Sequence, residues 1–222
     1  MEENIILENF PATLEWLKKT TMGKQEIKMC PQFSVFGMGI KSTNPEAVWN
    51  LMETYRYIIG DEAKDATEHL RLLSNKADAR DYKAGHFRFC TFSGVFNRRA
   101  ASALVSHSGL MTIDIDDIEP SSELSRIREQ LIHDKKFDTA MLFVSPSGNG
   151  IKWIPFIGNI TADRHGEWFD CIKNYLVFEY GISIDKSGRD VCRTCFLPHD
   201  AECYLNSEYL NNINDKTIII KK

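Results

Sequence analysis

The chain has 222 residues, a net charge of −4, and 43% hydrophobic and 26% charged residues. This composition is ordinary for a globular protein of one large or two small domains, and no run approaches the roughly 18 apolar residues of a membrane span. The acidic start does not predict a secretory signal, and the six cysteines are too scattered for a disulfide framework. We therefore expect a cytoplasmic protein with free thiols and no membrane partner. Because a dedicated nucleic-acid-binding protein is usually basic, any nucleic acid must contact a local patch, or carboxylates through bound cations.

The first zone, residues 1–78, has mostly helical patterns and is expected to pack on the core that follows. Residues 44–60 carry apolar side chains at helical spacing after Pro45 and reach a stop signal at Gly60. Residues 61–76 continue as a second helix with Asp61 as its N-cap. Residues 34–40 predict a short strand.

The second zone, residues 79–109, is expected to be irregular and basic. Its arginines are interleaved with phenylalanines, which is typical of surfaces that bind single strands. The candidates for nucleic-acid contact are Arg88, Arg98 and Arg99. The alternative is a loop whose aromatic residues belong to the core, namely Phe87, Phe89, Phe92 and Phe96.

The third zone, residues 110–206, alternates strand and helix patterns, and residues 79–210 together form the predicted core domain. We expect strands at 110–116, 138–145 and 151–157, helices at 121–134 and 162–180, and short strands near 182–185, 191–197 and 202–205. Asn149-Gly150 suits a tight turn, so the strands on either side of it should form an antiparallel hairpin. The prediction is an α+β fold with a mixed or antiparallel sheet, followed at 211–222 by a tail or a linker to a further C-terminal domain.

Asp114 and Asp116 alternate with isoleucines in the segment Gly109–Ile118. Side chains repeat every two residues on a strand, so both carboxylates share one face, about 6–7 Å apart at Cα. They could hold Mg²⁺ or Mn²⁺ for phosphoryl transfer, or they could belong to a strand face that is covered by water. Asp117 falls on the opposite face or begins the next turn.

Further candidates follow the acidic pair. Ser147, Gly148 and Gly150 could present backbone N–H groups to a phosphate, with Lys152 as a point charge beside them. The alternative is an ordinary hairpin tip with an exposed lysine. Asp185 could supply a third carboxylate, and Arg193 could clamp a phosphate; each could also be a surface charge.

Cys192, Cys195, His199 and Cys203 have the ligand types of a structural zinc site. A strand through this segment would point Cys192 and Cys195 to opposite sides. We therefore predict small core residues and no zinc.

The order of these motifs resembles the archaeo-eukaryotic primase, or primase-polymerase, superfamily. More closely, residues 94–118, 144–156 and 180–200 are similar to VirE N-terminal-like domains, which accompany helicase or other ATPase domains in bacterial mobile-element proteins. The resemblance covers about residues 80–205. It implies a primase-polymerase-like core with a mixed or antiparallel sheet flanked by helices.

The resemblance also implies roles for individual residues. Asp114, Asp116 and Asp185 would be the catalytic metal ligands. The triphosphate would contact Ser147, Gly148, Gly150, Lys152 and Arg193. Primase-polymerases usually have histidine where this chain has Lys152, which leaves the catalytic activity open.

The implied function is metal-dependent nucleotidyl transfer of the DNA primase or polymerase kind, with nucleotide triphosphates and a single-stranded DNA template as partners. Two alternatives remain. One is a catalytically idle nucleic-acid-binding or regulatory domain that partners a helicase-type ATPase. The other is a metal-dependent nuclease.

Overall fold

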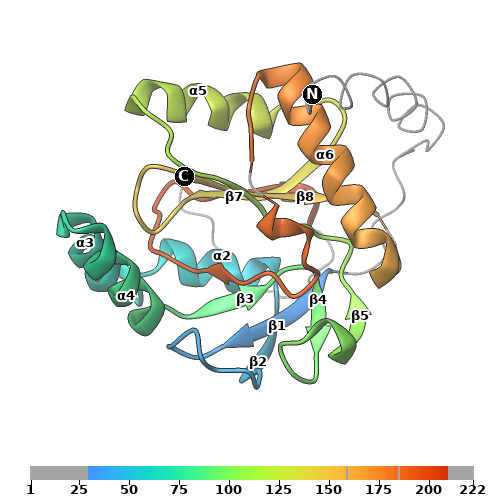
Figure 1. Ribbon diagram of the computed structural model, residues 1–222, viewed down its shortest axis with the longest axis horizontal. Coiled ribbons are helices and arrows are strands. Elements are labelled where there is room, and N and C mark those ends of the chain that lie inside the picture. The colour runs from blue at the N-terminus through green and yellow to red at the C-terminus, as the bar shows by residue number, and fades with distance from the viewer. Residues whose placement is uncertain (1–29, 159, 185, 210–222) are drawn as a thin grey trace.

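The computed structural model describes residues 30–158, 160–184 and 186–209, and these residues form an α+β fold in which every strand pair is antiparallel (Figure 1). The α+β class and the antiparallel sheet are therefore confirmed. No helix in this part of the chain is long and apolar enough to cross a membrane.

The first sheet has the strand order β2-β1-β3-β9. Its strands are β1 (Gln32–Phe36), β2 (Ala47–Asn50), β3 (Phe89–Thr91) and β9 (Cys195–Phe196). A separate hairpin joins β4 (Gly94–Phe96) and β5 (Leu104–His107). Since β1 and β2 precede residue 78 and β3 and β9 follow it, the two sides of the expected boundary share one sheet.

The second sheet has the order β10-β7-β8-β6. Its strands are β6 (Ile113–Ile115), β7 (Asp138–Val144), β8 (Ile151–Phe156) and β10 (Tyr204–Leu205). The predicted β7–β8 hairpin is confirmed, because Val144 pairs with Ile151 across the turn at residues 145–150.

The helices are α2 (Leu51–Ile59), α3 (Lys64–Leu72), α4 (Lys76–His86), α5 (Ser121–Ile132) and α6 (His165–Tyr180). The predictions of α5 and α6 are confirmed, and α6 ends at Gly181 in the left-handed conformation (φ 68°) that glycine adopts without strain. Helices α5 and α6 lie on one side of the second sheet, while α3 and α4 lie beside each other at the edge of the molecule (Figure 1).

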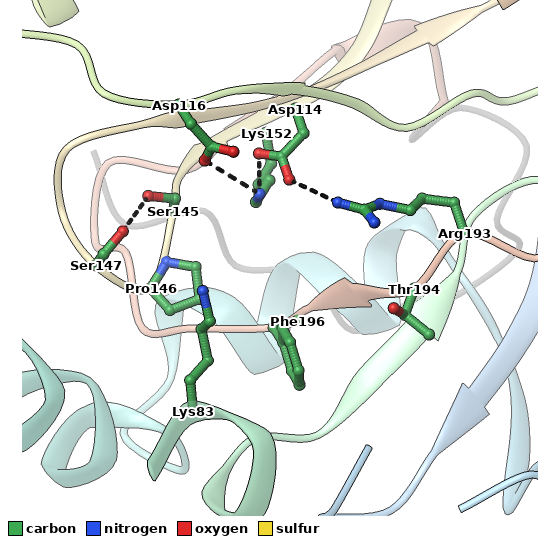
Figure 2. A pocket seen from close by; sticks show the side chains of 10 residues that line it. All are labelled: Lys83, Asp114, Asp116, Ser145, Pro146, Ser147, Lys152, Arg193, Thr194 and Phe196. Atoms are coloured by element: carbon green, nitrogen blue, oxygen red, sulfur yellow. Dashed lines mark hydrogen bonds and ion pairs between the residues drawn. The ribbon is translucent and has the colours of Figure 1, made fainter. Parts of the chain in front are cut away.

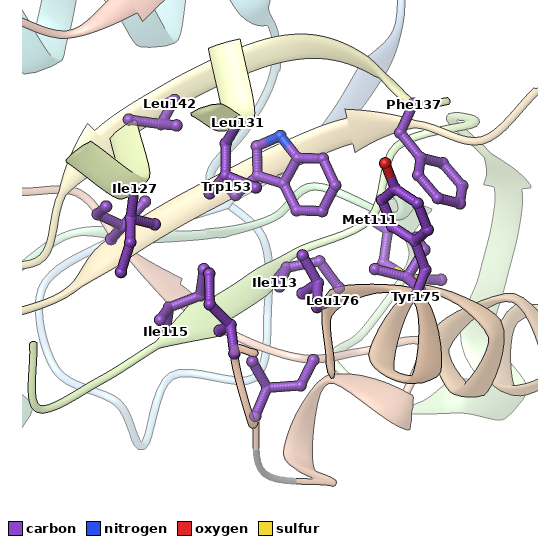
Figure 3. Packing of buried hydrophobic residues seen from close by; sticks show 14 of the residues in the cluster. Met111, Ile113, Ile115, Ile127, Leu131, Phe137, Leu142, Trp153, Tyr175 and Leu176 are labelled. Carbon is purple, nitrogen blue, oxygen red and sulfur yellow. The ribbon is translucent and has the colours of Figure 1, made fainter. Parts of the chain in front are cut away.

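The hydrophobic core consists of two clusters, one on each face of the second sheet. The first cluster packs Ile113, Ile115 and Trp153 against α5 and α6 (Figure 3). The second cluster packs Phe143 and Ile154 against the first sheet and α2. Strands β7 and β8 are thus covered on both faces, as their apolar sequences require.

Three predictions about local structure are wrong. Residues 47–50 are strand β2, because the side chain of Asn50 accepts from the N–H groups of Met52 and Glu53 and starts α2 only there. Helix α3 begins after Ala63 instead of Asp61. Residues 76–86 form α4, capped by Asn75, where an irregular segment was expected.

The chain after α6 is also less regular than predicted. The described residues of the segment 182–185 form no strand, Ser187–Arg189 is a 3₁₀ turn, and the strand expected over 191–197 is limited to Cys195–Phe196. Residues 211–222, the expected tail, lie outside the described residues.

Candidate functional site

Strands β6 and β8 place an acid and a base directly opposite each other. Asp114 pairs with Lys152 in the antiparallel register, between the pairs Ile113–Trp153 and Ile115–Ile151. Since side chains alternate along a strand, the apolar pairs enter the first core cluster and the charged pair points to the other face, toward the first sheet. Lys152 therefore faces the same side of the sheet as Asp114. The alternative interpretation, an ordinary hairpin tip with an exposed lysine, is wrong, because only 8% of Lys152 is exposed.

The carboxylate of Asp114 is held by two cations (Figure 2). Lys152 Nζ donates to Oδ1 of Asp114, and Arg193 Nη2 donates to Oδ2 at 3.3 Å from a position 79 residues later in the chain. The same Nζ lies 4.0 Å from Oδ1 of Asp116. The structure therefore brings together four of the predicted site residues.

Asp116 is the open carboxylate of this group, with 59% of its side chain exposed. Partial removal from water raises the pKa of Asp116 above its usual value; Lys152 opposes this effect and Asp114 reinforces it. Asp117 is exposed, as expected, and adopts a positive φ of 55° at the start of the turn.

The β7–β8 turn forms one wall of the site through Ser145, Pro146 and Ser147. The N–H of Gly148 donates to Ser145 O at 2.9 Å within the turn, so the expected phosphate contact of this amide is not open. A Cβ on Gly150 would lie 2.7 Å from the backbone oxygen of Ile115, and glycine there lets the turn approach β6 closely. The hydroxyls of Ser145 and Ser147 lie 3.1 Å apart and line the site.

Arg71 on α3 holds this turn from outside. Its guanidinium donates to Pro146 O at 3.3 Å and to Ser145 O at 3.4 Å. The α3–α4 pair is thereby fixed against the serine turn.

These groups surround a pocket of about 160 Å³ between the two sheets. Its lining residues are Lys83, Asp114, Asp116, Ser145, Pro146, Ser147, Lys152, Arg193, Thr194 and Phe196. The volume is below the roughly 300–1,000 Å³ of pockets that enclose a drug-sized ligand. A phosphate group fits inside, and the rest of a nucleotide would extend outward.

Lys83 lines the pocket although it was not among the predicted site residues. It comes from α4 and makes no ion pair with any described residue, unlike Lys152 and Arg193. Desolvation lowers the pKa of Lys83, and the charge of Lys152 adds to this effect. Lysine, lysine and arginine against two aspartates give the pocket a net charge of +1. The basic character of residues 79–109 was the signal in the sequence that could have identified Lys83, but a helix was not predicted there.

The two aspartates supply the oxygen ligands that Mg²⁺ prefers, and Asp116 is open to accept an ion. Both oxygens of Asp114, however, are already bound to cations, and Lys152 Nζ lies between the two carboxylates. The described residues include no group of three or more acidic, histidine or cysteine side chains placed to hold a metal. Asp185, the predicted third acid, lies outside the described residues. Among the described residues, Asp116 is thus the one carboxylate of the pocket that no cation holds closely.

The aromatic part of the 79–109 prediction is wrong. Phe87, Phe89, Phe92 and Phe96 are each at most 2% exposed, so they cannot stack on bases and belong to the core.

The arginines of the same segment differ in their partners. Arg88 pairs with Glu46 at 3.0 Å and lies over the ring of Trp49, while Arg99 donates to Ile40 O at 2.7 Å. Arg98 is exposed. Two of the three candidate nucleic-acid contacts therefore already have structural partners within the chain.

The four residues of the possible zinc site have separate surroundings. Cys195 lies on β9 opposite Cys90 and, like Cys203, belongs to the second core cluster. Cys192 contacts Asp190, and Nδ1 of His199 donates to Gly60 O at 2.7 Å. All six cysteines are free thiols. The absence of zinc from the purified protein stays a prediction.

Comparison with known proteins gives a family and no individual relative. No curated protein and no solved structure matches the chain. The family model described as BT4734-like, N-terminal domain, matches residues 83–205, which is more than half of the 222 residues and includes Lys83, both aspartates, the serine turn and Arg193. The chain belongs to the BT4734-like N-terminal domain family.

Proposed function

We propose that the chain binds a nucleoside triphosphate in the pocket between its sheets and transfers the nucleotide to a strand, as a DNA primase or polymerase does, during replication of a mobile element. The observation that carries the proposal is the convergence of Asp114, Asp116, Lys152 and Arg193 in one pocket. Their order along the chain resembles that of the primase-polymerase superfamily and of VirE N-terminal-like domains.

The basic and hydroxyl side chains of the pocket would bind the phosphates. Lys83, Lys152 and Arg193 bind phosphate oxygens, with Arg193 offering a planar donor fork and the lysines point charges. The hydroxyls of Ser145 and Ser147 add neutral donors to the same phosphates. When a phosphate enters, it competes with Asp114 for Lys152 and Arg193, and the carboxylate becomes free to bind a cation.

Asp114 and Asp116 would hold a Mg²⁺ or Mn²⁺ ion that enters with the triphosphate. Such an ion would supply positive charge to the phosphates and favour attack by a 3′-hydroxyl on the α-phosphate, with pyrophosphate as the leaving group. Because the pocket alone carries a net positive charge, we expect Mn²⁺ to bind weakly without nucleotide and tightly with it.

The direct test is synthesis of labelled product on single-stranded DNA with nucleotide triphosphates and Mn²⁺. Wild type should make product, and Asp116→Asn should not, although the exposed position of this side chain leaves the fold intact. Asp117→Asn is the matched control, since Asp117 is exposed outside the pocket and asparagine tolerates its positive φ. Equal synthesis by Asp116→Asn and wild type would contradict the proposal.

Nucleotide binding is measured separately by calorimetry. Lys83→Ala should weaken binding roughly ten- to a hundredfold, because a charge-assisted contact is worth about 1.5–3 kcal/mol. Lys41→Ala removes an exposed lysine that does not line the pocket, and it should bind as wild type does. If Lys83→Ala also binds as wild type does, Lys83 does not contact the phosphates.

The second candidate is a catalytically idle nucleic-acid-binding or regulatory domain that partners a helicase-type ATPase. It is favoured by one observation, the occupation of both Asp114 oxygens by cations. Nucleotide binding without synthesis would support it. A metal-dependent nuclease, the third possibility, would instead degrade an oligonucleotide in Mn²⁺ without any triphosphate.

A further inference from the structure

Helix α4 separates its charges by face. Lys76, Arg80 and Lys83 are spaced i, i+4 and i+7, so at 3.6 residues per turn they share one face over about 10 Å of helix. Asp78 and Asp81 fall on the opposite side. Among the described residues the three basic side chains have no ion-pair partner, and Lys76 and Arg80 are exposed. This basic face is therefore open to an anionic partner.

Aromatic rings occupy the neighbouring face of the same helix. Tyr82 and His86 stack with centroids 3.9 Å apart and planes 9° apart, and His69 of α3 adds a tilted ring 4.6 Å from Tyr82. His69 and His86 are exposed, and none of the three rings belongs to a core cluster. They differ in this from the buried phenylalanines that follow them in the chain.

The basic face leads into the pocket. Lys83 at its end is both a member of this face and a wall of the pocket, and Figure 2 shows its side chain extending from α4 toward Pro146. Arg71 fixes α3 to the same turn. A chain of phosphates bound along α4 would thus arrive at the proposed nucleotide site.

We propose that α4 binds a single-stranded nucleic acid, with Lys76 and Arg80 on its phosphates and the His69–Tyr82–His86 rings beside its bases. Positive charge with accessible aromatic rings is the combination that binds single strands without strong sequence preference. The direction of the strand, toward the pocket, rests on the proposed function, whereas the binding itself does not. This surface takes the place of the segment around Arg88 and Arg99, whose side chains have partners within the chain.

The experiment measures fluorescence anisotropy of labelled oligo-dT and oligo-U against salt concentration. Each phosphate contact to a single strand contributes about 0.7 to the slope of log K against log salt. Lys76→Ala/Arg80→Ala should therefore make the slope shallower by about 1.4 and weaken binding about 20-fold at 0.1 M salt. His86→Ala, which removes one exposed ring, should weaken binding about fivefold. The dT and U probes distinguish a DNA strand from an RNA strand.

Lys135→Ala/Lys136→Ala is the matched control, since it removes two exposed lysines between α5 and β7, and it should leave slope and affinity unchanged. The Lys76→Ala/Arg80→Ala protein should still bind nucleotide in the pocket as wild type does, because neither residue lines it. Failure of nucleotide binding in wild type would refute the proposed function without affecting the strand measurement. Absence of oligonucleotide binding by wild type, or an equal loss in the control, would overturn the assignment of α4.

Discussion

The two faces of the β6–β8 strand pair have opposite chemistry although they belong to the same six paired residues. On one face Ile113, Ile115 and Trp153 pack without water against α5 and α6. On the other, Asp114 and Lys152 are nearly as enclosed but carry charge.

The two faces are expected to contribute differently to the free energy of unfolding. Apolar burial stabilises by about 25 cal/mol for each Å² removed from water. A buried ion pair loses most of its attraction to desolvation and is often no better than an apolar pair of similar size. Asp114, Lys152 and Arg193 therefore add little net stability, in keeping with the proposed role in binding, and experiments on each face can test this difference.

The largest effect is expected on the apolar face. Trp153→Ala should reduce the free energy of unfolding by about 3–5 kcal/mol, because it leaves a cavity under α5 and α6 and removes the 2.7 Å bond from Nε1 to Thr139 Oγ1. Urea unfolding measures the loss. Trp153→Phe, which keeps most of the volume, should lose less, and equal losses would argue against close packing on this face.

A smaller loss is expected on the charged face. Asp114→Ala should cost about 3 kcal/mol in the same measurement, because it leaves Lys152 enclosed with only the exposed Asp116, 4.0 Å away, to offset its charge. Asp114→Leu combined with Lys152→Met should recover most of that loss while abolishing nucleotide binding. If the double variant is no more stable than Asp114→Ala, the comparison between the two faces is wrong.

The smallest effect on the free energy of unfolding is expected for a buried pair of neutral histidines, His107 and His165. The N–H of Gly109 donates to Nδ1 of His107, so Nε2 of His107 carries the hydrogen that it donates to Nδ1 of His165 at 3.0 Å. Nε2–H of His165 then donates to Gly188 O at 3.3 Å. Desolvation lowers the pKa of both histidines from 6.5 to about 4. The pair therefore stays neutral and joins β5, α6 and the turn at residues 187–189.

This histidine pair predicts a loss of stability in mild acid. Below pH 6.5 the two histidines bind protons in the unfolded chain but stay neutral in the folded protein. The free energy of unfolding therefore falls as pH decreases from 6.5 toward about 4. We expect a loss of about 1–2 kcal/mol on going from pH 7.5 to pH 6. Urea unfolding at both pH values should show a smaller change in His107→Gln/His165→Gln than in wild type. An equal change in the two proteins would mean that the histidines are not the titrating groups.

Much of the charged face could be predicted from local sequence. The alternation of Asp114 with isoleucines predicted a strand, the Asn149-Gly150 turn predicted an antiparallel hairpin, and both were confirmed. The site beyond that hairpin could not be predicted in the same way. Lys83 comes from a helix that was taken for an irregular segment, since its Asn75 cap was not recognised, and the fit of Gly150 against Ile115 depends on how closely β6 approaches the turn.

The sequence by itself determined the α+β class, the β7–β8 hairpin, helices α5 and α6, and the shared face of Asp114 and Asp116. Each of these follows from a period of two or 3.6 residues, or from a turn signal, which acts over a few neighbours. Only the tertiary structure decided that Arg193 meets Asp114 and that Lys83 enters the same pocket without an ion pair to any described residue. It also decided that Phe87, Phe89 and Phe96 are buried while the rings on α4 remain accessible. These outcomes depend on which sheet packs on which, because the partner of a long charged or aromatic side chain is set by distant segments and not by its neighbours in the chain.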